Sequence, residues 1–432
     1  MNMVNSRGTW GSRSGFILAA AGSAVGLGNI WGFPTQVGQG GGAAFVLVYL
    51  ICVLLICAPI MVAEIALGRH TRLSPSGAFR SLAPKTSWWL VGALGVATGA
   101  GILSFYSVIA GWTVAYVWFT ATSAVSGSVD SIDQFFVSFT SNGVLSLALT
   151  FSVLGTTAII LLGGVRAGIE RATKALMPAL ILLLLVLAVR ATTLPGADVG
   201  LSYYMQPDLS RLLDIRVFNA ALGQAFFSLS LGMGTMIVYG SYLSKNENLI
   251  SSAAWVASLD TIIALMAGLA IFPALFAFGL EPTIGAGLIF VVLPNIFNEM
   301  FLGTLFGSGF FILLGIAALT SMISIVEVPV AYFIDEFKWS RKKSVTVAGI
   351  GAFCAGIPAA LSLGALDALS NFISIEGRNY GFLDFMNLIF GQYSLMIGSL
   401  GVALFAGWKW GKSKIIKEIK TGHQNFSYGT LY

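Results

Sequence analysis

Charged residues are scarce in this chain. Only 9% of its 432 residues are Asp, Glu, Lys or Arg, whereas 56% are hydrophobic and the mean hydropathy is +0.87. Soluble domains carry about 25% charged residues, so water cannot be the solvent for most of this chain. The composition therefore excludes an ordinary soluble domain and predicts an integral membrane protein.

Cysteine and histidine are also rare. Cys52, Cys57 and Cys354 fall in apolar runs, and His70 and His423 lie far apart in polar segments. We therefore expect the cysteines to be small buried apolar residues without a disulfide framework, and the histidines do not predict a metal cluster. The apolar runs lack a nucleophile beside a base, so the sequence does not favour a membrane enzyme.

Long apolar runs, in contrast, are abundant. A window of about 19 residues, enough to cross a bilayer as a helix, finds ten predicted spans: 14–36, 42–68, 89–122, 143–162, 173–190, 217–240, 250–278, 304–334, 344–364 and 385–408. Only helices and closed barrels satisfy the backbone in lipid, and runs of this length predict helices. The expected class is an all-α integral membrane protein with both termini on one side of a lipid bilayer.

The basic residues predict the orientation. With the N-terminus inside, all but four of the 23 Lys and Arg residues lie in cytoplasmic segments, and the four outer ones are Arg190, Arg211, Arg216 and Arg378. This asymmetry follows the positive-inside rule, so both termini are predicted to be cytoplasmic, in the cell (inner) membrane. The inner leaflet accounts for the net charge of +5, and no nucleic-acid partner is expected.

Three carboxylates fall within predicted spans, namely Glu64, Asp260 and Glu327. No Lys or Arg lies within any predicted span to pair with them. A lone charge inside a membrane is costly. Each of the three is therefore expected to be protonated, hydrogen-bonded or facing a cation.

The first and sixth spans both contain helix breakers. Residues 22–34 read GSAVGLGNIWGFP and residues 226–236 read FFSLSLGMGTM. Paired breaks at matching positions of two halves indicate the binding site of a secondary transporter, because broken backbone survives in the membrane only against protein or a polar cavity. Each half has five spans, an odd number, so the halves should be inverted relative to each other. Close helix packing through glycine is the alternative explanation.

The eighth span carries a polar stripe. Ala317, Thr320, Ser321 and Ser324 lie at positions i, i+3, i+4 and i+7, which share one helix face. Uncharged carbonyl and hydroxyl oxygens suit a monovalent cation better than Ca²⁺ or Mg²⁺, which favour carboxylates. Contact between helices through small polar residues is the alternative.

Together these motifs resemble the neurotransmitter:sodium symporter family. GSAVGLGNIWGFP, FYSVIAGW, GQAFFSLSLGMGT and ALTSMISIVEVPVAYFIDE match its signatures in order, and the similarity runs from about residue 7 to residue 420. The resemblance implies a five-plus-five inverted-repeat (leucine-transporter-like) fold with unwound helices 1 and 6. It also implies import of amino acids or amines driven by the sodium (Na+) gradient.

This fold would divide the chain into a first inverted repeat (spans 1–5), an extracellular loop, a second inverted repeat (spans 6–10) and a cytoplasmic tail, at 1–190, 191–216, 217–410 and 411–432. Most members of the family have one or two further spans, and both a short natural form and an incomplete chain would give this sequence. A homo-oligomer is possible.

Carried over residue by residue, the family's sites fall on three groups of residues. One sodium site, completed by the substrate carboxylate, would comprise Ala24, Asn29, Ser228 and Asp260. A second sodium site would comprise Gly22, Val25, Ala317, Thr320 and Ser321. The substrate site would comprise Ser23, Ala24, Gly28, Ile102, Tyr106, Phe227, Ser228, Ser230, Met233, Ser321 and Ile325. In this site the Tyr106 hydroxyl would donate to the substrate carboxylate, and Phe227 would act as a lid.

The residue at position 26 bears on the substrate. Amine-transporting members carry an aspartate where Gly26 stands, so the resemblance implies a substrate that brings its own carboxylate, hence an amino acid. Ile102, Met233 and Ile325 are apolar, and methionine adapts its shape readily. We therefore expect a hydrophobic or aromatic L-amino acid.

Asp260 occupies a place often held by asparagine in the family. Ala264 replaces the glutamate of some chloride-independent relatives, while Tyr49, Gln224 and Ser228 match the neighbourhood where other members bind chloride. We expect Asp260 both to ligate sodium and to supply the negative charge for which other members need chloride. A protonated aspartate that only hydrogen-bonds between helices is the alternative.

The gates of the family are partly retained. Gly32 and Asn387 replace the outer arginine and aspartate, so the outer gate should depend more on Tyr106 and Phe227. The resemblance implies an inner gate at Arg7, Trp10, Tyr242 and Asp335. A positive-inside arginine beside a solvated aspartate is the alternative for this pair.

Two further carboxylates have structural roles to test. Glu64 matches a glutamate that braces the unwound part of the sixth span by hydrogen bonding, and Glu327 is interpreted as a helix-packing carboxylate with no assigned role. As a whole, the sequence favours a sodium-driven symporter. The alternative is a non-transporting amino-acid sensor or a channel on the same fold.

Overall fold

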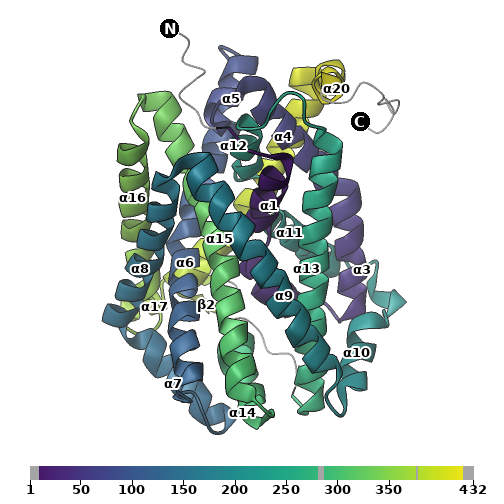
Figure 1. Ribbon diagram of the computed structural model, residues 1–432, viewed down its shortest axis with the longest axis vertical. Helices are drawn as coiled ribbons and strands as arrows, with labels where there is room; N and C mark the ends of the chain where they lie inside the picture. The colour runs from purple at the N-terminus through teal and green to yellow at the C-terminus, as the bar shows by residue number, and fades with distance from the viewer. Residues whose placement is uncertain (1–8, 281–286, 376–377, 422–432) are drawn as a thin grey trace.

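The computed structural model describes residues 9–280, 287–375 and 378–421, which form a bundle of long helices (Figure 1). Eight helices in these ranges are long and apolar enough to cross a membrane. In chain order, with η marking π-helical segments, they are α3–η3–α4 (Ala43–Cys52, Val53–Cys57, Ala58–Thr71), α6 (Trp89–Ala121), α8 (Gly143–Leu162), η4–α9 (Val165–Glu170, Arg171–Thr192), α13 (Leu249–Ala277), α15 (Gly303–Phe337), α16 (Arg341–Leu361) and α18–η7–α19–η8–α20 (Phe382–Met386, Asn387–Tyr393, Ser394–Leu404, Phe405–Gly411, Lys412–Thr421).

The other two predicted spans, the first and the sixth, are interrupted. The first comprises α1 (Arg13–Ala24), the π-helical η2 (Gly28–Gly32) and α2 (Phe33–Gln39), with a bend of 47° at the break. The sixth comprises α11 (Ile215–Ser228) and α12 (Thr235–Ser241). The predicted membrane-spanning helices, with helices 1 and 6 unwound, are therefore confirmed.

The break in the sixth span is produced by backbone that an α-helix cannot contain. Ser230, Gly232 and Gly234 have φ angles of 53°, 79° and 81°. Glycine adopts this left-handed region readily, and serine only at a cost. The alternation of these residues in LSLGMG therefore ends α11 and starts α12 seven residues later.

Shorter elements that the sequence analysis did not predict connect the spans. They are α5 (Pro75–Leu82), α7 (Val129–Ser141), α10 (Ala197–Met205), the 3₁₀-helix η5 (Leu209–Arg211), η6 (Leu288–Val292), α14 (Leu293–Glu299), α17 (Asp367–Ser370) and the hairpin β1–β2 (Ile373–Ile375, Arg378–Tyr380). In the hairpin, Ile373 pairs with Tyr380 in an antiparallel register. A search for apolar windows of bilayer length misses such elements because each is shorter than the window of about 19 residues.

The helix ends separate into two groups. Figure 1 shows α5, α12 and α20 at the same end as the start of α1, and α7 and α14 at the opposite end. Ion pairs at the α20 end join segments that the sequence predicts to be cytoplasmic, namely Arg13–Glu247, Arg69–Glu418 and Arg80–Glu336. The structure therefore places these segments together at one end of the bundle. That this end faces the cytoplasm remains the prediction of the positive-inside rule. Cys354 is exposed, contrary to the expectation that all three cysteines are buried.

Helices α4 and α12 are in backbone contact through two glycines. A Cβ atom added at Gly68 would lie 1.9 Å from the carbonyl oxygen of Ile237, and one added at Gly240 would lie 2.5 Å from that of Ile65. Small residues at such positions let two helices approach closely in a membrane. Because each helix presents a glycine to a carbonyl of the other, α4 and α12 are expected to move together.

Substitution of Gly68 by alanine should therefore destabilise the protein. The added methyl group has no space beside the Ile237 carbonyl, and overpacking of this kind costs about 1–3 kcal/mol. The measurement is the melting temperature of the purified protein in detergent. Gly349→Ala on α16 is the matched control, because nothing lies within 4 Å of its added Cβ, and alanine favours helix over glycine by about 1 kcal/mol. A Gly68→Ala variant that melts as high as the control would contradict the contact.

Candidate functional site

The two interruptions meet α15 at Ser23. Ser230, from the break in the sixth span, donates from Oγ to the Ser23 carbonyl oxygen at 2.9 Å, and Ser321 of α15 donates to the same oxygen at 3.1 Å. The Ser23 hydroxyl donates to Ser324 Oγ at 2.7 Å. All four side chains are at most 4% exposed. The carbonyl freed by the break in the first span is thus satisfied by one hydroxyl from the break of the sixth span and one from α15.

A cluster of polar side chains lies beside this junction and is called the Asp260 cluster, comprising Asn29, Tyr49, Ser228 and Asp260. Asn29 Nδ2 donates to Asp260 Oδ1 at 2.7 Å and to Ser228 Oγ at 3.0 Å. The Ser228 hydroxyl lies 2.9 Å from Asp260 Oδ2, and the Tyr49 hydroxyl lies 3.4 Å from the same oxygen. Three of the four residues predicted for the first sodium site are therefore in direct contact. The fourth, Ala24, is the last residue of α1 and is buried.

The Asp260 carboxylate is fully buried. Within the described ranges, no Lys, Arg or His forms an ion pair with it. Hydrogen bonds from amide and hydroxyl groups compensate only part of the cost of burying a charge. The Asp260 carboxylate and the Ser228 hydroxyl provide oxygens that fit a hard cation. The Asn29 amide directs Nδ2 toward them, and its Oδ1 accepts from the Gly26 backbone N–H at 3.0 Å.

A second group of oxygens, called the Thr320 cluster, joins α15 to the break in the first span. Thr320 Oγ1 lies 3.0 Å from the carbonyl oxygen of Ala317 and 3.5 Å from that of Val25, and Ser321 Oγ lies 3.3 Å from the Val25 carbonyl. Four residues predicted for the second sodium site are thus adjacent. Gly22, the fifth, is buried in α1, where its added Cβ would lie 3.2 Å from Met177 Sδ. The cluster offers neutral oxygens only, which suit a monovalent cation.

The Tyr106 hydroxyl points into the break of the first span. It accepts a hydrogen bond from the Leu27 backbone N–H at 3.0 Å. A Cβ atom added at Gly26 would lie 2.6 Å from this hydroxyl oxygen and 2.2 Å from Ser321 Oγ. Gly26 is therefore necessary where these groups converge, because any side chain there would displace Tyr106 or Ser321.

The apolar residues predicted for the substrate side chain lie against α6. The Phe227 ring lies over the backbone of Gly28, where an added Cβ would be 2.9 Å from Cδ1. A Cβ atom added at Gly95 would lie 3.2 Å from the backbone carbonyl carbon of Met233, and one added at Gly99 would lie 3.7 Å from Ile325 Cγ2. Ile102, less than one turn further along α6, is fully buried. Met233 and Ile325 thus lie beside the stretch of α6 that contains Ile102, whereas Phe227 lies against the break of the first span.

The two other carboxylates that fall within predicted spans have their own partners. Glu64 Oε1 accepts a hydrogen bond from the Gly232 backbone N–H at 2.8 Å, which confirms the predicted brace of the unwound sixth span. Glu327, to which the sequence analysis assigned no role, accepts from the Tyr242 hydroxyl at 2.7 Å and from both terminal nitrogens of Arg341 at 3.0 and 2.8 Å. Arg341 begins α16 just outside the predicted ninth span, so a search for basic residues within the spans could not find it.

The predicted gate residues have distinct surroundings. At the outer side, an added Cβ at Gly32 would face Gln224 Oε1 at 3.1 Å, and the Asn387 side chain lies against Gly391 of its own helix. At the other end, Trp10 Nε1 donates to the Tyr239 carbonyl at 3.0 Å, and the Trp10 and Tyr242 rings pack edge to face. Asp335 accepts a hydrogen bond from the Ser74 backbone N–H. Arg7 lies outside the described residues.

Sequence reasoning missed contacts that fix this arrangement. Gln224 Nε2 donates to the carbonyl oxygen of Gly28 at 2.7 Å, and Glu170 accepts from the Gly11 backbone N–H at 2.6 Å, which holds the start of α1 against α9. The sequence signal for such contacts is a polar residue inside an apolar span or just beside one. The partners of Gln224 and Glu170 are more than 150 positions away, so the sequence did not pair them.

Comparisons with known proteins agree with this geometry. The model of the Sodium:neurotransmitter symporter family matches residues 7–128 and 126–420. The chain is 39% identical to a sodium-dependent transporter of Bacillus subtilis, YhdH, over 414 residues that cover 96% of this chain and 90% of that protein. It is 36% identical to a sodium-dependent transporter of Haemophilus influenzae, with 93% and 89% covered.

A solved structure and a more distant relative complete the comparison. The crystal structure of MhsT in complex with L-phenylalanine superposes with a TM-score of 0.90, at 46% identity, covering 98% of this chain and 95% of that chain. The sodium-dependent serotonin transporter of Drosophila melanogaster is 28% identical, with 87% of this chain and 68% of that protein covered.

Replacement of Thr320 by valine should weaken sodium binding. Valine keeps the shape of threonine and removes the hydroxyl oxygen of the Thr320 cluster, so the sodium concentration that gives half-maximal stabilisation should rise at least about tenfold. The measurement is the melting temperature against sodium concentration at constant ionic strength, because a bound ion stabilises the folded state. Thr157→Val is the control, since Thr157 is equally buried and bonds only within α8. If the two variants gave the same dependence of melting temperature on sodium concentration, Thr320 would not be a sodium ligand.

Proposed function

The chain belongs to the sodium:neurotransmitter symporter family, and because it is a multi-pass membrane protein and a sodium-dependent symporter of that family, we propose that it imports a hydrophobic or aromatic L-amino acid by alternating access. One observation carries this proposal. The breaks of the first and sixth spans, α15 and Tyr106 converge on one buried group of oxygens and N–H groups.

The proposed roles of the two oxygen clusters follow from their chemistry. The Asp260 cluster, with Ala24, holds one sodium ion together with the carboxylate of the substrate, and the Thr320 cluster, with Gly22, holds the other. A ligand shared between ion and substrate makes each bind more tightly in the presence of the other, which is a coupling free energy. This is how the sodium gradient is tied to substrate import.

The proposed substrate is an amino acid because glycine, and not a carboxylate, stands at position 26 beside the Tyr106 hydroxyl. An aspartate at position 26 would have to displace the Tyr106 hydroxyl and Ser321. The Tyr106 hydroxyl oxygen accepts from the Leu27 N–H, which leaves its O–H to donate to a carboxylate that enters with the substrate. The unwound backbone next to α1 and η2 provides further polar groups for an amino acid.

The proposed preference for an apolar side chain follows from the residues along α6. Ile102, Met233 and Ile325 are apolar side chains that are at most 3% exposed, and Phe227 adds a partly buried aromatic ring over Gly28. Burial of an apolar ligand among them is favourable. The related transporter MhsT was crystallised with L-phenylalanine. Ser230 and Ser228 remain at the polar side of this group, where they hold the backbone and Asp260.

In the proposed cycle the two inverted repeats, 1–190 and 217–410, move around this site. Phe227 closes over Gly28 on the outer side, and the contacts of Trp10, Tyr242 and Asp335, with Arg7, then open toward the cytoplasm. The basic end that carries α5 and α20 is the cytoplasmic one in the cell membrane. Each positive charge that moves inward gains about 2.3 kcal/mol per 100 mV of membrane potential, so sodium entry can drive accumulation.

Uptake into proteoliposomes tests the function. With sodium outside and a negative interior, labelled L-phenylalanine should accumulate at least about tenfold above the level without a gradient. Phenethylamine, which is phenylalanine without the carboxylate, should not compete. Binding without accumulation would identify a sensor, and a flux far above about 10³ per second would identify a channel, since alternating-access motions take microseconds to milliseconds or longer. Either result would contradict the proposal.

Asp260 is proposed to replace chloride. The Tyr49 and Ser228 hydroxyls, which match the family's chloride neighbourhood, both contact its carboxylate. A fixed negative charge at this place balances the sodium charge without a bound anion. The protein should therefore be independent of chloride.

Asparagine at position 260 should make uptake depend on chloride. The wild-type protein should transport equally in chloride and gluconate, whereas Asp260→Asn should be at least about tenfold slower in gluconate and partly recover in chloride. The measurement is the initial rate of phenylalanine uptake in the two anions. Glu336→Gln, a carboxylate at the surface of the α20 end, is the control and should behave as wild type. A chloride requirement in the wild-type protein would refute the role of Asp260.

A further inference from the structure

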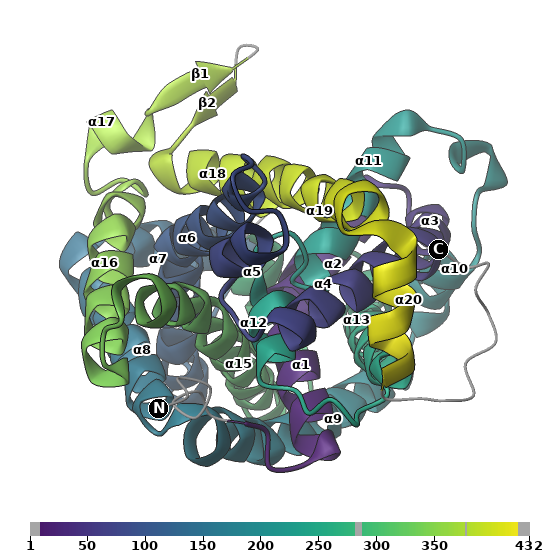
Figure 2. The ribbon, with the colours of Figure 1, turned by 90° about the horizontal axis from the view of Figure 1, so that it is seen from above.

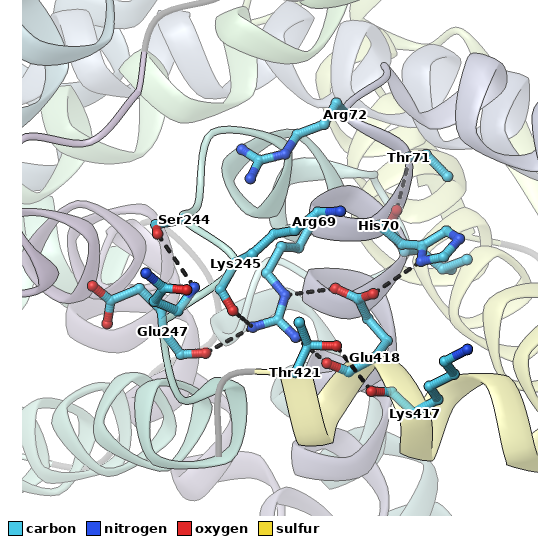
Figure 3. A network of polar contacts seen from close by, with 12 residues as sticks. Arg69, His70, Thr71, Arg72, Ser244, Lys245, Glu247, Lys417, Glu418 and Thr421 are labelled. Atoms are coloured by element: carbon cyan, nitrogen blue, oxygen red, sulfur yellow. Dashed lines mark hydrogen bonds and ion pairs between the residues drawn. The ribbon is translucent and has the colours of Figure 1, made fainter. Parts of the chain in front are cut away.

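A buried arginine joins three segments at the α20 end of the molecule. Arg69, in the last turn of α4, is 0% exposed. Its Nε donates to Glu418 Oε1 at 2.7 Å, its Nη1 donates to the Glu247 carbonyl at 2.7 Å and lies 3.5 Å from the Lys245 carbonyl, and its Nη2 donates to the Glu418 carbonyl (Figure 3). Arg69 therefore ties α4 both to α20 and to residues 243–248, which follow α12.

The helix α20 lies across this end of the bundle beside α4 (Figure 2). Its direction changes at Gly411, where φ is 92°. Ile415 and Ile419 are 2% and 1% exposed, so one face is docked on the protein, and the other face exposes Lys412, Lys414, Lys417 and Lys420. Glu418 lies on the docked face, where His70 Nδ1 contacts its second oxygen at 2.9 Å. The helix is thus held by a charged pair at the centre of an apolar contact.

The donors of Arg69 explain why α20 can influence residues 243–248. A buried guanidinium is tolerated only when its N–H groups are paired and its charge is compensated. Arginine, unlike lysine, has a planar fork that reaches several acceptors at fixed angles. Glu418 supplies the only carboxylate that contacts Arg69 within the described residues, so loss of this contact leaves the cation uncompensated and frees it to move away from the two carbonyls.

Residues 242–251, which include this segment and the first turn of α13, in turn contact the start of α1. Glu247 Oε2 lies 3.8 Å from Arg13 Nε, and Arg13 Nη2 donates to Ser251 Oγ at 2.6 Å. The Trp10 backbone N–H donates to the Tyr242 carbonyl at 3.4 Å. Since α1 and α12 are the halves of the interrupted spans on the α20 side of the site, a path from Ser23 to this end must open between them.

We propose that Arg69 is a positioning residue for closure of the cytoplasmic end, and that α20 acts as a strap that sets its position through Glu418. With α20 docked, Arg69 holds residues 243–248, these residues hold α1, and the end stays closed. When α20 is released, the start of α1 separates from α12 more often. The inference rests on the proposed function, because this closure has a consequence only for alternating access.

Hydrogen exchange of the full chain in lipid nanodiscs tests the strap directly. Glu418→Ala should speed backbone exchange at least tenfold in residues 243–252 and 10–16, and Glu418→Gln and Arg69→Lys should give the same pattern with a smaller increase. Lys417→Ala, an exposed neighbour on the same helix, is the matched control and should exchange as wild type. The two conservative variants decide the question if Glu418→Ala does not fold.

The sodium dependence of uptake separates the two explanations. Loss of packing alone would not raise the half-saturating sodium concentration while leaving the rate at saturating sodium unchanged. A larger open population reduces the fraction of protein that can bind sodium, and apparent affinity falls by that fraction. We expect the half-saturating sodium concentration of Glu418→Gln to rise three- to tenfold, while the rate at saturating sodium stays within twofold of wild type. Arg69→Lys should behave in the same way, and Lys417→Ala should not change.

The outcomes separate the strap from the proposed function. If exchange increases only within residues 412–421, α20 is a passive appendage and the inference is wrong. An unchanged sodium curve in both conservative variants would also overturn it. If the wild-type protein fails to accumulate phenylalanine while exchange still spreads from α20 to residues 10–16, the proposed function fails and the mechanical link stands.

Discussion

The arrangement of this protein depends on satisfying the backbone groups that two broken helices expose inside a membrane. An unpaired N–H or carbonyl in lipid costs several kcal/mol, so each freed group needs a partner from another helix. The Ser23 carbonyl accepts from two hydroxyls, the Gly232 N–H donates to Glu64, and the Leu27 N–H donates to Tyr106. The partners come from the break of the sixth span and from three other helices, so satisfying the breaks also fixes how α1, α4, α6 and α15 are placed around the site.

The same constraint explains three buried carboxylates with three different surroundings. Glu327, inside α15, forms an ion pair with Arg341 at the start of α16, while Glu64 accepts a backbone N–H from the break of the sixth span. Asp260 has only neutral hydrogen-bond partners within the described residues, namely Asn29, Ser228 and Tyr49. Asp260 is therefore the carboxylate best placed to exchange its partners for a cation, which distinguishes a binding group from a structural one.

Close packing transmits these local constraints to the end of the molecule. Gly68 and Gly240 bring α4 and α12 into backbone contact, so the short helix after the second break follows α4. Arg69, one residue after Gly68, extends this contact to α20 and to the residues that receive α1. A movement that opens the site must therefore break polar contacts that are few and identifiable, whereas the glycine contact between α4 and α12 persists.

The sequence by itself determined the spans, the two interruptions and the residue types at the site, because helix length, glycine and serine breakers and unpaired charges act locally along the chain. The resemblance to a known family, and not a local pattern, indicated that Glu64 would brace the sixth span. The sequence did not determine that Arg341 pairs with Glu327, that Glu170 holds the start of α1, or that Glu418 reaches Arg69 across 349 positions. Only the tertiary structure decided these pairings, because an ion pair or a capping contact between distant segments depends on how helices pack and turn in space, and neither spacing nor hydropathy records that geometry.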